Sequence, residues 1–149
     1  MPGAGFIIYR KNIKNENEFL LLKKIDEEGF DIPKGAVDPG ETFFKTAYRE
    51  LSEEANLELS DIEILKDSNG KIISYTSVYA KDEKRKLVLY IAKIKDDAIN
   101  KISLSQNPYL EHESFTWKNF YTSEALCLYY LKDIFNLGES LINNHEYQY

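Results

Sequence analysis

The chain has 149 residues, of which 43% are hydrophobic and 30% are charged, and its formal net charge is -6. This length suits one domain, here taken as residues 1–149, and the composition is that of a globular chain, not of a disordered or fibrous one. The acidic balance argues against an extended nucleic-acid surface, because gripping a phosphate backbone normally takes a basic face.

The cysteine content and the N-terminal sequence indicate the cellular compartment in which the protein works. Cys127 is the only cysteine, which excludes an internal disulfide and fits a reducing environment, and we interpret it as a small buried hydrophobe. The first residues lack the basic start and long apolar stretch of a secretory signal, and no segment reaches about 18 apolar residues. We expect a soluble, cytoplasmic monomer without membrane contact.

The first third of the chain predicts two strands, a loop and a helix. Residues 6–10 and 18–23 are short apolar runs separated by polar residues, a pattern typical of paired strands. Gly and Pro punctuate residues 26–40, which predicts a shaped loop with little regular structure. Residues 42–55 contain neither, and their apolar residues predict the buried stripe of a helix: Phe43, Ala47, Leu51 and Ala55.

The remaining residues alternate between sheet and helix. Residues 62–65, 72–79 and 86–94 predict strands, and residues 115–117 a last short one. Residues 123–137 predict a second helix, with Thr122 or Ser123 as N-cap and Gly138 as terminator. This order implies an α/β (α+β) sandwich, a mixed β-sheet flanked by helices, and not a doubly wound parallel fold.

Three carboxylates share one face of the first predicted helix. Glu50, Glu53 and Glu54 occupy positions i, i+3 and i+4, within about one turn of each other. A solvated helix face tolerates such repulsion at a cost of a few tenths of a kcal/mol per pair. The same three oxygen donors are also what Mg2+ or Mn2+ requires, so the spacing alone leaves both interpretations open.

The loop before the helix adds charged residues near these acids. Glu41 lies at the start of the helix, where an acid suits the positive end of the helix dipole. Lys34 would be a mobile cation suited to a phosphate oxygen, or else an ordinary surface lysine. Arg49 precedes Glu53 by four residues, so an ion pair that orients a ligand carboxylate is expected.

Together these residues resemble the Nudix box. The match comprises Gly35, then Glu41 after five residues, then the run from Arg49 to Leu57 after seven more. One position departs: the family usually has Gly where this chain has Asn56, and Asn is the next residue most tolerant of the left-handed conformation that ends helices. We expect this substitution to affect stability more than chemistry.

The resemblance implies a Nudix α/β/α sandwich and a hydrolase of substrates built on a nucleoside diphosphate, with Mg2+ or Mn2+ as cofactor. It implies that Glu50, Glu53 and Glu54 bind the metal, helped by the Gly35 carbonyl. Glu41 and Arg49 would brace the helix and loop. Water activated by the metal and a carboxylate base would attack phosphorus.

Outside the box, nearly the whole chain resembles the asymmetric diadenosine tetraphosphate hydrolases. This resemblance is carried by residues 5–10, 18–22 and 33–35, the Glu111-His112 pair before Trp117, and Glu124-Ala125. It implies that Glu111 is a further metal ligand or the general base, with Glu113 as the neighbour that could be mistaken for it. His112 would bind phosphate or simply pack, and His145 receives no role.

The resemblance also suggests aromatic walls for adenine, because base stacking on Tyr contributes about 1–3 kcal/mol. Tyr79 and Tyr130 are the candidates, with Tyr75 and Leu131 as competitors if the alignment slips by a residue. Basic residues follow Tyr79 and would either meet distal phosphates or form a charged hairpin tip: Lys81, Lys84, Arg85 and Lys86.

Several activities are consistent with these residues. The first is cleavage of diadenosine tetraphosphate to ATP and AMP. The alternatives are removal of pyrophosphate from an RNA 5′ end, hydrolysis of another nucleoside diphosphate derivative, and a nucleotide sensor without turnover. A sensor would be expected to have lost box acids, and all are present.

Overall fold

The computed structural model describes residues 2–77, 86–104 and 109–146. Its strands are β1 (Gly3–Lys11), β2 (Asn17–Lys24), β3 (Phe30–Asp31), β4 (Lys34–Ala36), β5 (Ile62–Ile64), β6 (Ser74–Thr76), β7 (Leu87–Ile94) and β8 (His112–Lys118). Its α-helices are α1 (Phe43–Ala55), α2 (Phe120–Leu126) and α3 (Lys132–Glu146). Short 3-10 turns are η1 (Leu59–Asp61), η2 (Asp96–Lys101) and η3 (Tyr129–Leu131).

All eight strands join one mixed sheet. Five of them follow the order β3-β2-β1-β7-β5, while β4 pairs with β1, β6 with β7 and β8 with β2. The β1 strand runs antiparallel to β2 and parallel to β7, so the sheet is neither purely parallel nor purely antiparallel. The predicted strands are therefore present, although β5, β6 and β7 are each shorter than expected.

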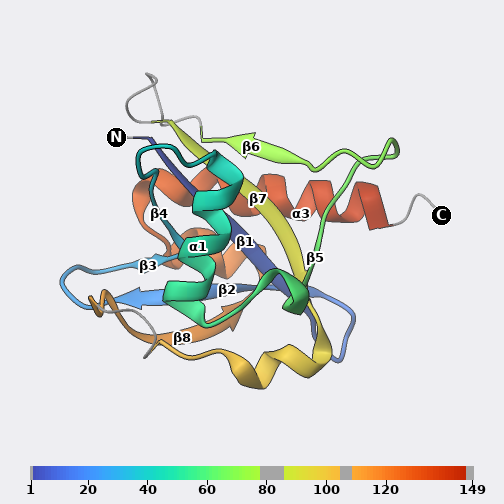
Figure 1. Ribbon diagram of the computed structural model, residues 1–149. Coiled ribbons are helices and arrows are strands. Elements are labelled where there is room, and N and C mark those ends of the chain that lie inside the picture. Colours follow the sequence, from blue (N-terminus) through green and yellow to red (C-terminus); the bar gives the residue numbers. More distant parts are fainter. Residues whose placement is uncertain (1, 78–85, 105–108, 147–149) are drawn as a thin grey trace.

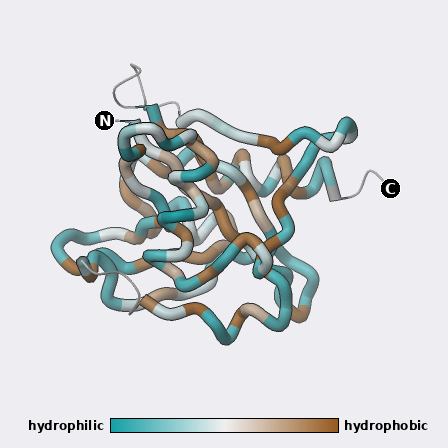
Figure 2. The backbone as a smooth tube through the Cα atoms, in the orientation of Figure 1, coloured by the Kyte–Doolittle hydropathy of each residue, from teal (hydrophilic) through white to brown (hydrophobic). Residues whose placement is uncertain are grey.

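Both faces of the sheet are buried, because consecutive side chains of a strand point to opposite sides. Phe6 and Ile8 of β1 pack in the core that α1 covers, whereas Ile7 and Tyr9 pack in the core that α3 covers. In Figure 1, α1 lies in front of the sheet and α3 behind it. Hydrophobic residues follow the central strands and hydrophilic ones the outer loops (Figure 2). The predicted sandwich is confirmed.

Helix α1 begins and ends where its sequence predicts. The Thr42 side chain caps it by accepting a hydrogen bond from the Lys45 amide at 3.1 Å. Ala47, Leu51 and Ala55 are fully buried, as the stripe required. Asn56 ends the helix in the left-handed conformation, with φ 60° and ψ 34°. The helix therefore stands on the sheet in one orientation, which fixes where its acidic face points.

The C-terminal helix prediction was wrong in its boundaries. Helix α2 starts earlier, at the N-cap Asn119, and stops at Leu126, because Leu128 N donates to Phe30 O at 2.9 Å and draws the chain toward β3. Helix α3 then continues through Gly138, which is not a terminator. A side chain at Gly138 would begin 3.7 Å from Phe19, so this helix passes closely over the sheet.

Two further differences concern residues 26–40 and Cys127. The segment expected to be irregular contains the short strands β3 and β4, because both find partners on longer strands. Cys127 is buried, as expected, and burial raises the pKa of its thiol to about 11. No helix among the described ranges is long and apolar enough to span a membrane.

Substitutions of Asn56 test how the end of α1 is held. Asn56→Ala should lower the free energy of unfolding by about 1 kcal/mol more than Asn56→Gly, because a Cβ costs about 1–2 kcal/mol in the left-handed region and Gly avoids that cost. Both variants lose the bond from the Asn56 side chain to Lys101 O, so that loss cancels in the comparison. Urea denaturation measures the difference; equal values would contradict this account.

Candidate functional site

The acidic face of α1 is partly buried. The exposed fractions of the Glu50, Glu53 and Glu54 side chains are 14%, 38% and 1%. Burial raises the pKa of Glu54 to about 10 and that of Glu50 to about 7. The neighbouring carboxylates add to both shifts, since Glu53 disfavours charge on Glu50, and Glu111 on Glu54. Without a cation, this face therefore resists full ionisation.

Strand β4 lies directly against these carboxylates. The Lys34 backbone amide donates to Glu54 Oε1 at 2.8 Å. A Cβ on Gly35 would come within 2.1 Å of Glu50 Oε1, so only glycine lets the carboxylate approach the strand. The strand is itself held close to β1, where a Cβ on Gly5 would meet Pro33 O at 2.3 Å. Two glycines therefore allow the loop and the helix to meet.

Arg49 binds most of the surrounding acids. It forms two bonds with Glu41, from Nε to Oε2 at 2.8 Å and from Nη2 to Oε1 at 3.0 Å. Its Nη1 lies 3.0 Å from Glu50 Oε1 and 3.3 Å from Glu53 Oε2, so the expected i,i+4 ion pair is present. Hydrogen bonding from Arg49 lowers the pKa of Glu41 to about 2. Arg49 thus ties the helix to the loop that begins it.

Strand β8 begins with His112, and Glu111 lies directly before it, so the second half of the chain adds a histidine and another glutamate to the site. One ligand atom from each of Glu54, Glu111 and His112 lies within 4.8 Å of the others. His112 is 2% exposed, and its Nδ1 lies 3.5 Å from Glu54 Oε2. Glu113 is exposed and lies outside this group, so the geometry distinguishes it from Glu111.

A divalent cation fits this arrangement. Glu54 Oε2 is buried and has no hydrogen-bond partner among the residues that the structure describes. An unpaired buried carboxylate oxygen is costly, and a bound cation would offset both that cost and the repulsion among the glutamates. The cluster therefore has the donors and the electrostatic need for a metal ion, and it does not by itself select which one.

Lys34 is held in place, not mobile as the sequence suggested. Its Nζ lies 3.1 Å from Asp31, and its side chain is 15% exposed. Burial opposes its charge, but Asp31 and Tyr130 together outweigh burial and hold the pKa of Lys34 above its usual range. The Nζ also sits 5.3 Å from the centre of the Tyr130 ring. Lys34 therefore joins the carboxylate cluster to this aromatic side chain.

Asp31 is the site residue that sequence reasoning missed. It is 3% exposed and accepts hydrogen bonds from the Lys34 side chain and the Ile32 amide. Burial alone would raise the pKa of Asp31, but the Lys34 charge and the hydrogen bonds with His112, Ile32 and Lys34 together lower it. An Asp in a segment rich in Gly and Pro indicates a turn, and no sequence signal distinguishes it from a turn residue.

The candidates for the adenine wall differ in burial and in the element that carries them. Leu131 is fully buried in the core, so it offers no exposed wall. Tyr130 belongs to η3, not to the long helix, and is half-buried. The Tyr75 hydroxyl donates to Asp133 of α3. Tyr79 lies outside the described residues.

The described basic and histidine candidates, Lys86 and His145, lie in different parts of the structure. Lys86 lies over the Phe43 ring, with Nζ 5.4 Å from its centre. His145 lies in the last turn of α3. The other basic candidates fall outside the described residues: Lys81, Lys84 and Arg85.

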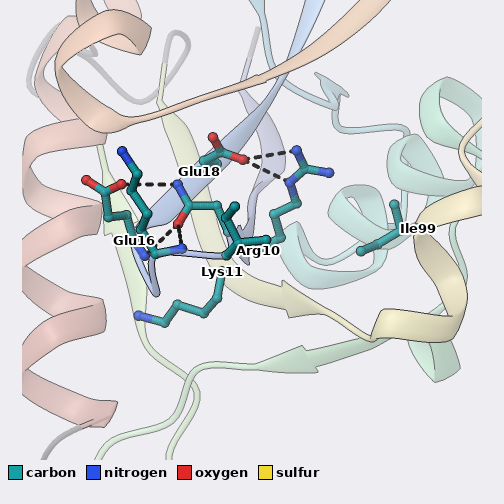
Figure 3. A pocket seen from close by; sticks show the side chains of 8 residues that line it. Arg10, Lys11, Glu16, Glu18 and Ile99 are labelled. Carbon is teal, nitrogen blue, oxygen red and sulfur yellow. Dashed lines mark hydrogen bonds and ion pairs between the residues drawn. The ribbon is translucent and has the colours of Figure 1, made fainter.

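A shallow depression of about 500 Å3 at the β1–β2 turn lies apart from this cluster (Figure 3). Its two glutamates already have partners, since Arg10 Nε donates to Glu18 at 3.0 Å and Asn12 donates to Glu16 at 3.3 Å. Arg10 lies five residues along β1 from Gly5, the partner of Lys34, a separation of about 16 Å. We therefore exclude the depression from the candidate site.

Comparison with known proteins agrees with the geometry. The family model described as NUDIX domain matches residues 1–135. The chain belongs to this family. It is 34% identical over 123 residues to the asymmetrical bis(5'-nucleosyl)-tetraphosphatase of Mus musculus, covering 78% of each chain. The crystal structure of a C. elegans Ap4A hydrolase binary complex aligns with a TM-score of 0.68 and 26% identity, covering 97% of this chain and 94% of that one.

A relative with a different name matches less of the chain. The RNA pyrophosphohydrolase of Pelagibacter ubique (strain HTCC1062) is 35% identical over 75 residues, covering 49% of this chain and 43% of its own. The NUDIX family assignment and the sandwich fold predicted from sequence are thus confirmed, whereas the roles of individual site residues remain predictions.

The raised carboxylate pKa values predict how the metal-free protein responds to pH. Above the usual glutamate pKa of 4.5, folded Glu50 and Glu54 retain protons that the unfolded chain releases. The free energy of unfolding in EDTA should therefore fall as pH rises from about 5 to 8, by on the order of 1–3 kcal/mol.

Excess Mg2+ should reverse most of that loss at pH 8, because metal binding favours the ionised carboxylates. The lowered pKa values of Asp31, Glu41 and Asp61 change the free energy of unfolding only below this pH window, so they do not mask the effect. Chemical denaturation at several pH values measures it. Stability in EDTA that stays constant or rises over this window would contradict the raised values.

Proposed function

We propose that the protein is a divalent-metal-dependent hydrolase of dinucleoside polyphosphates that cleaves diadenosine tetraphosphate to ATP and AMP. The observation that carries the hydrolytic part is the buried Glu54 oxygen that accepts no hydrogen bond from the described residues. It lies beside Glu111 and His112, and its helix carries two further acids, Glu50 and Glu53. The substrate part rests on the relatives named bis(5'-nucleosyl)-tetraphosphatase, which match 78% of the chain.

Glu50, Glu53 and Glu54 would hold Mg2+ or Mn2+, helped by the Gly35 carbonyl. The bound ion would lower the pKa of a coordinated water and neutralise charge on the phosphates. Among the residues themselves, Arg49 keeps α1 and the Glu41 loop together through its paired bonds. Strand β4 fixes Glu54 through the Lys34 amide.

Glu111 is the proposed acceptor for the proton of the attacking water. It is exposed, so solvent and substrate can reach it, while its neighbour in the cluster, Glu54, is buried. A base must lie within hydrogen-bond reach of the water that the metal orients, and Glu111 shares the cluster with the proposed ligands. Its identity as base or as a further ligand depends on where the ion binds.

The substrate-binding side would combine charge and aromatic surface. Lys34, held by Asp31, would present its remaining N–H donors to a phosphate oxygen. The Tyr130 ring lies next to Lys34 and would offer adenine a stacking surface, worth about 1–3 kcal/mol per base. Tyr79 and Lys86 complete the proposed contacts.

Removal of pyrophosphate from RNA is the second candidate, and one observation favours it: the partial match to an RNA pyrophosphohydrolase. That match covers 49% of the chain. The net charge of -6 gives no support for an extended RNA-binding face, although it permits binding of one triphosphorylated end.

Glu54→Gln tests the metal-ligand assignment. It keeps nearly the same shape while removing the buried negative charge, so metal affinity should fall and kcat/KM for diadenosine tetraphosphate should drop by at least about 100-fold. Glu63→Gln, on the exposed side of β5, is the matched control and should keep full activity. Full activity in Glu54→Gln would refute the assignment.

A substrate panel tests the proposed reaction. Diadenosine tetraphosphate, 5′-triphosphorylated RNA and simple nucleoside diphosphate derivatives are incubated with enzyme and Mg2+ in 18O-labelled water, and products are identified by mass. We expect ATP and AMP to form fastest, with the label reporting the attacked phosphorus. An intact dinucleotide beside a hydrolysed RNA end would replace the first candidate with the second.

A further inference from the structure

His112 contacts two carboxylates that come from different parts of the fold. Its Nε2 lies 3.4 Å from Asp31 Oδ2 on β3, and its Nδ1 lies 3.5 Å from Glu54 Oε2 on α1. All three side chains are buried, with exposed fractions of 2%, 4% and 1% for His112, Asp31 and Glu54. The imidazole therefore lies between two buried carboxyl groups.

The partners of Asp31 determine which ring nitrogen carries the proton. Asp31 accepts bonds from the Lys34 side chain and from the Ile32 amide, so it acts as an acceptor. His112 must then donate from Nε2. In a neutral ring this leaves the Nδ1 lone pair directed at Glu54 Oε2, which has no hydrogen-bond partner within the described parts of the chain.

Metal binding requires the ionised form of Glu54, and the Nδ1 lone pair then faces Oε2 at 3.5 Å, so a cation between them would bind both atoms. For bonds of about 2.0–2.2 Å, adjacent ligands of one ion lie about 3 Å apart and opposite ligands about 4.2 Å apart. The 3.5 Å between Nδ1 and Oε2, and the 4.8 Å limit that includes Glu111, are close to these separations. Small side-chain shifts would bring all three onto one ion.

We propose that His112 Nδ1 is a metal ligand, and that with Glu54 and Glu111 it forms a mixed nitrogen and oxygen site that favours Mn2+, Co2+ or Zn2+ over Mg2+. The inference rests on the proposed function, because it places this ion in the same carboxylate cluster. Imidazole binds borderline metals well, whereas Mg2+ prefers oxygen ligands and near-octahedral geometry.

Asp31 acts as a positioning residue in this arrangement. A metal-bound histidine commonly donates its other N–H to a carboxylate, which fixes the tautomer and raises the basicity of the ligand nitrogen. Asp31 fills that position and also holds Lys34 at 3.1 Å. The same carboxylate would therefore orient the metal ligand and the proposed phosphate-binding lysine.

His112→Gln tests the proposal by metal affinity, without relying on turnover. Calorimetric titrations of metal-free protein with Co2+, Zn2+ and Mg2+ should show Co2+ and Zn2+ affinity falling by at least about tenfold, with Mg2+ affinity changed less than about twofold. The visible Co2+ absorption should also change. His145→Gln, at the end of α3, is the control and should match the wild type.

Equal losses for Mg2+ and Co2+, or no loss for either, would overturn the assignment. If Glu54→Gln abolishes metal binding while His112→Gln leaves it intact, the proposed function stands and this inference fails alone. If neither variant affects metal binding, the proposed function fails as well.

A second measurement uses the unaltered protein, in case His112→Gln does not fold. The 15N spectrum of the two histidines should show His112 protonated at Nε2, and Zn2+ should shift its Nδ1 resonance while leaving His145 unchanged. Asp31→Asn should weaken Zn2+ binding less than His112→Gln does. A His112 resonance that does not respond to Zn2+ would contradict the nitrogen ligand.

Discussion

Repulsion among buried carboxylates is the constraint on which the site depends. Helix α1 turns Glu50 and Glu54 toward β4 and β8, and burial raises the pKa of both. A fold selected only for stability would not keep Glu54 at 1% side-chain exposure with an unpaired oxygen among its described neighbours. A bound cation would account for this arrangement, because it would balance the negative charge of the carboxylates. The hydrogen bonds and ion pairs around Glu54 would then hold the carboxylates in place for that cation.

Two cationic side chains compensate part of this charge, each at a different depth. Arg49 binds Glu41, Glu50 and Glu53 at the solvent side and so ties helix to loop. Lys34 pairs with Asp31 in the interior. Neither lies within hydrogen-bond distance of Glu54 Oε2 in the described structure. The protein's own cationic side chains therefore pair with the supporting acids, and neither pairs with the Glu54 oxygen that we propose as a metal ligand.

Local patterns predicted much of this fold, and long-range contacts account for what they missed. The stripe of α1, its Thr42 cap and the Asn56 terminator follow from nearby residues, so they were predictable. The break before α3 depends on the bond from Leu128 to Phe30, far apart in the chain. The proposed role of Asp31 depends on its contact with His112, 81 residues away. Pairings of this kind leave no signal in local periodicity.

Anomalous diffraction from crystals grown with Mn2+ would test the central claim most directly. The account predicts a manganese peak within bonding distance of the Glu54 carboxylate, with Glu50 or Glu111 also bound to the ion. It also predicts that the Arg49–Glu41 pair stays intact. A manganese-saturated crystal with no peak at Glu54, and with ions bound only elsewhere on the acidic surface, would contradict the account.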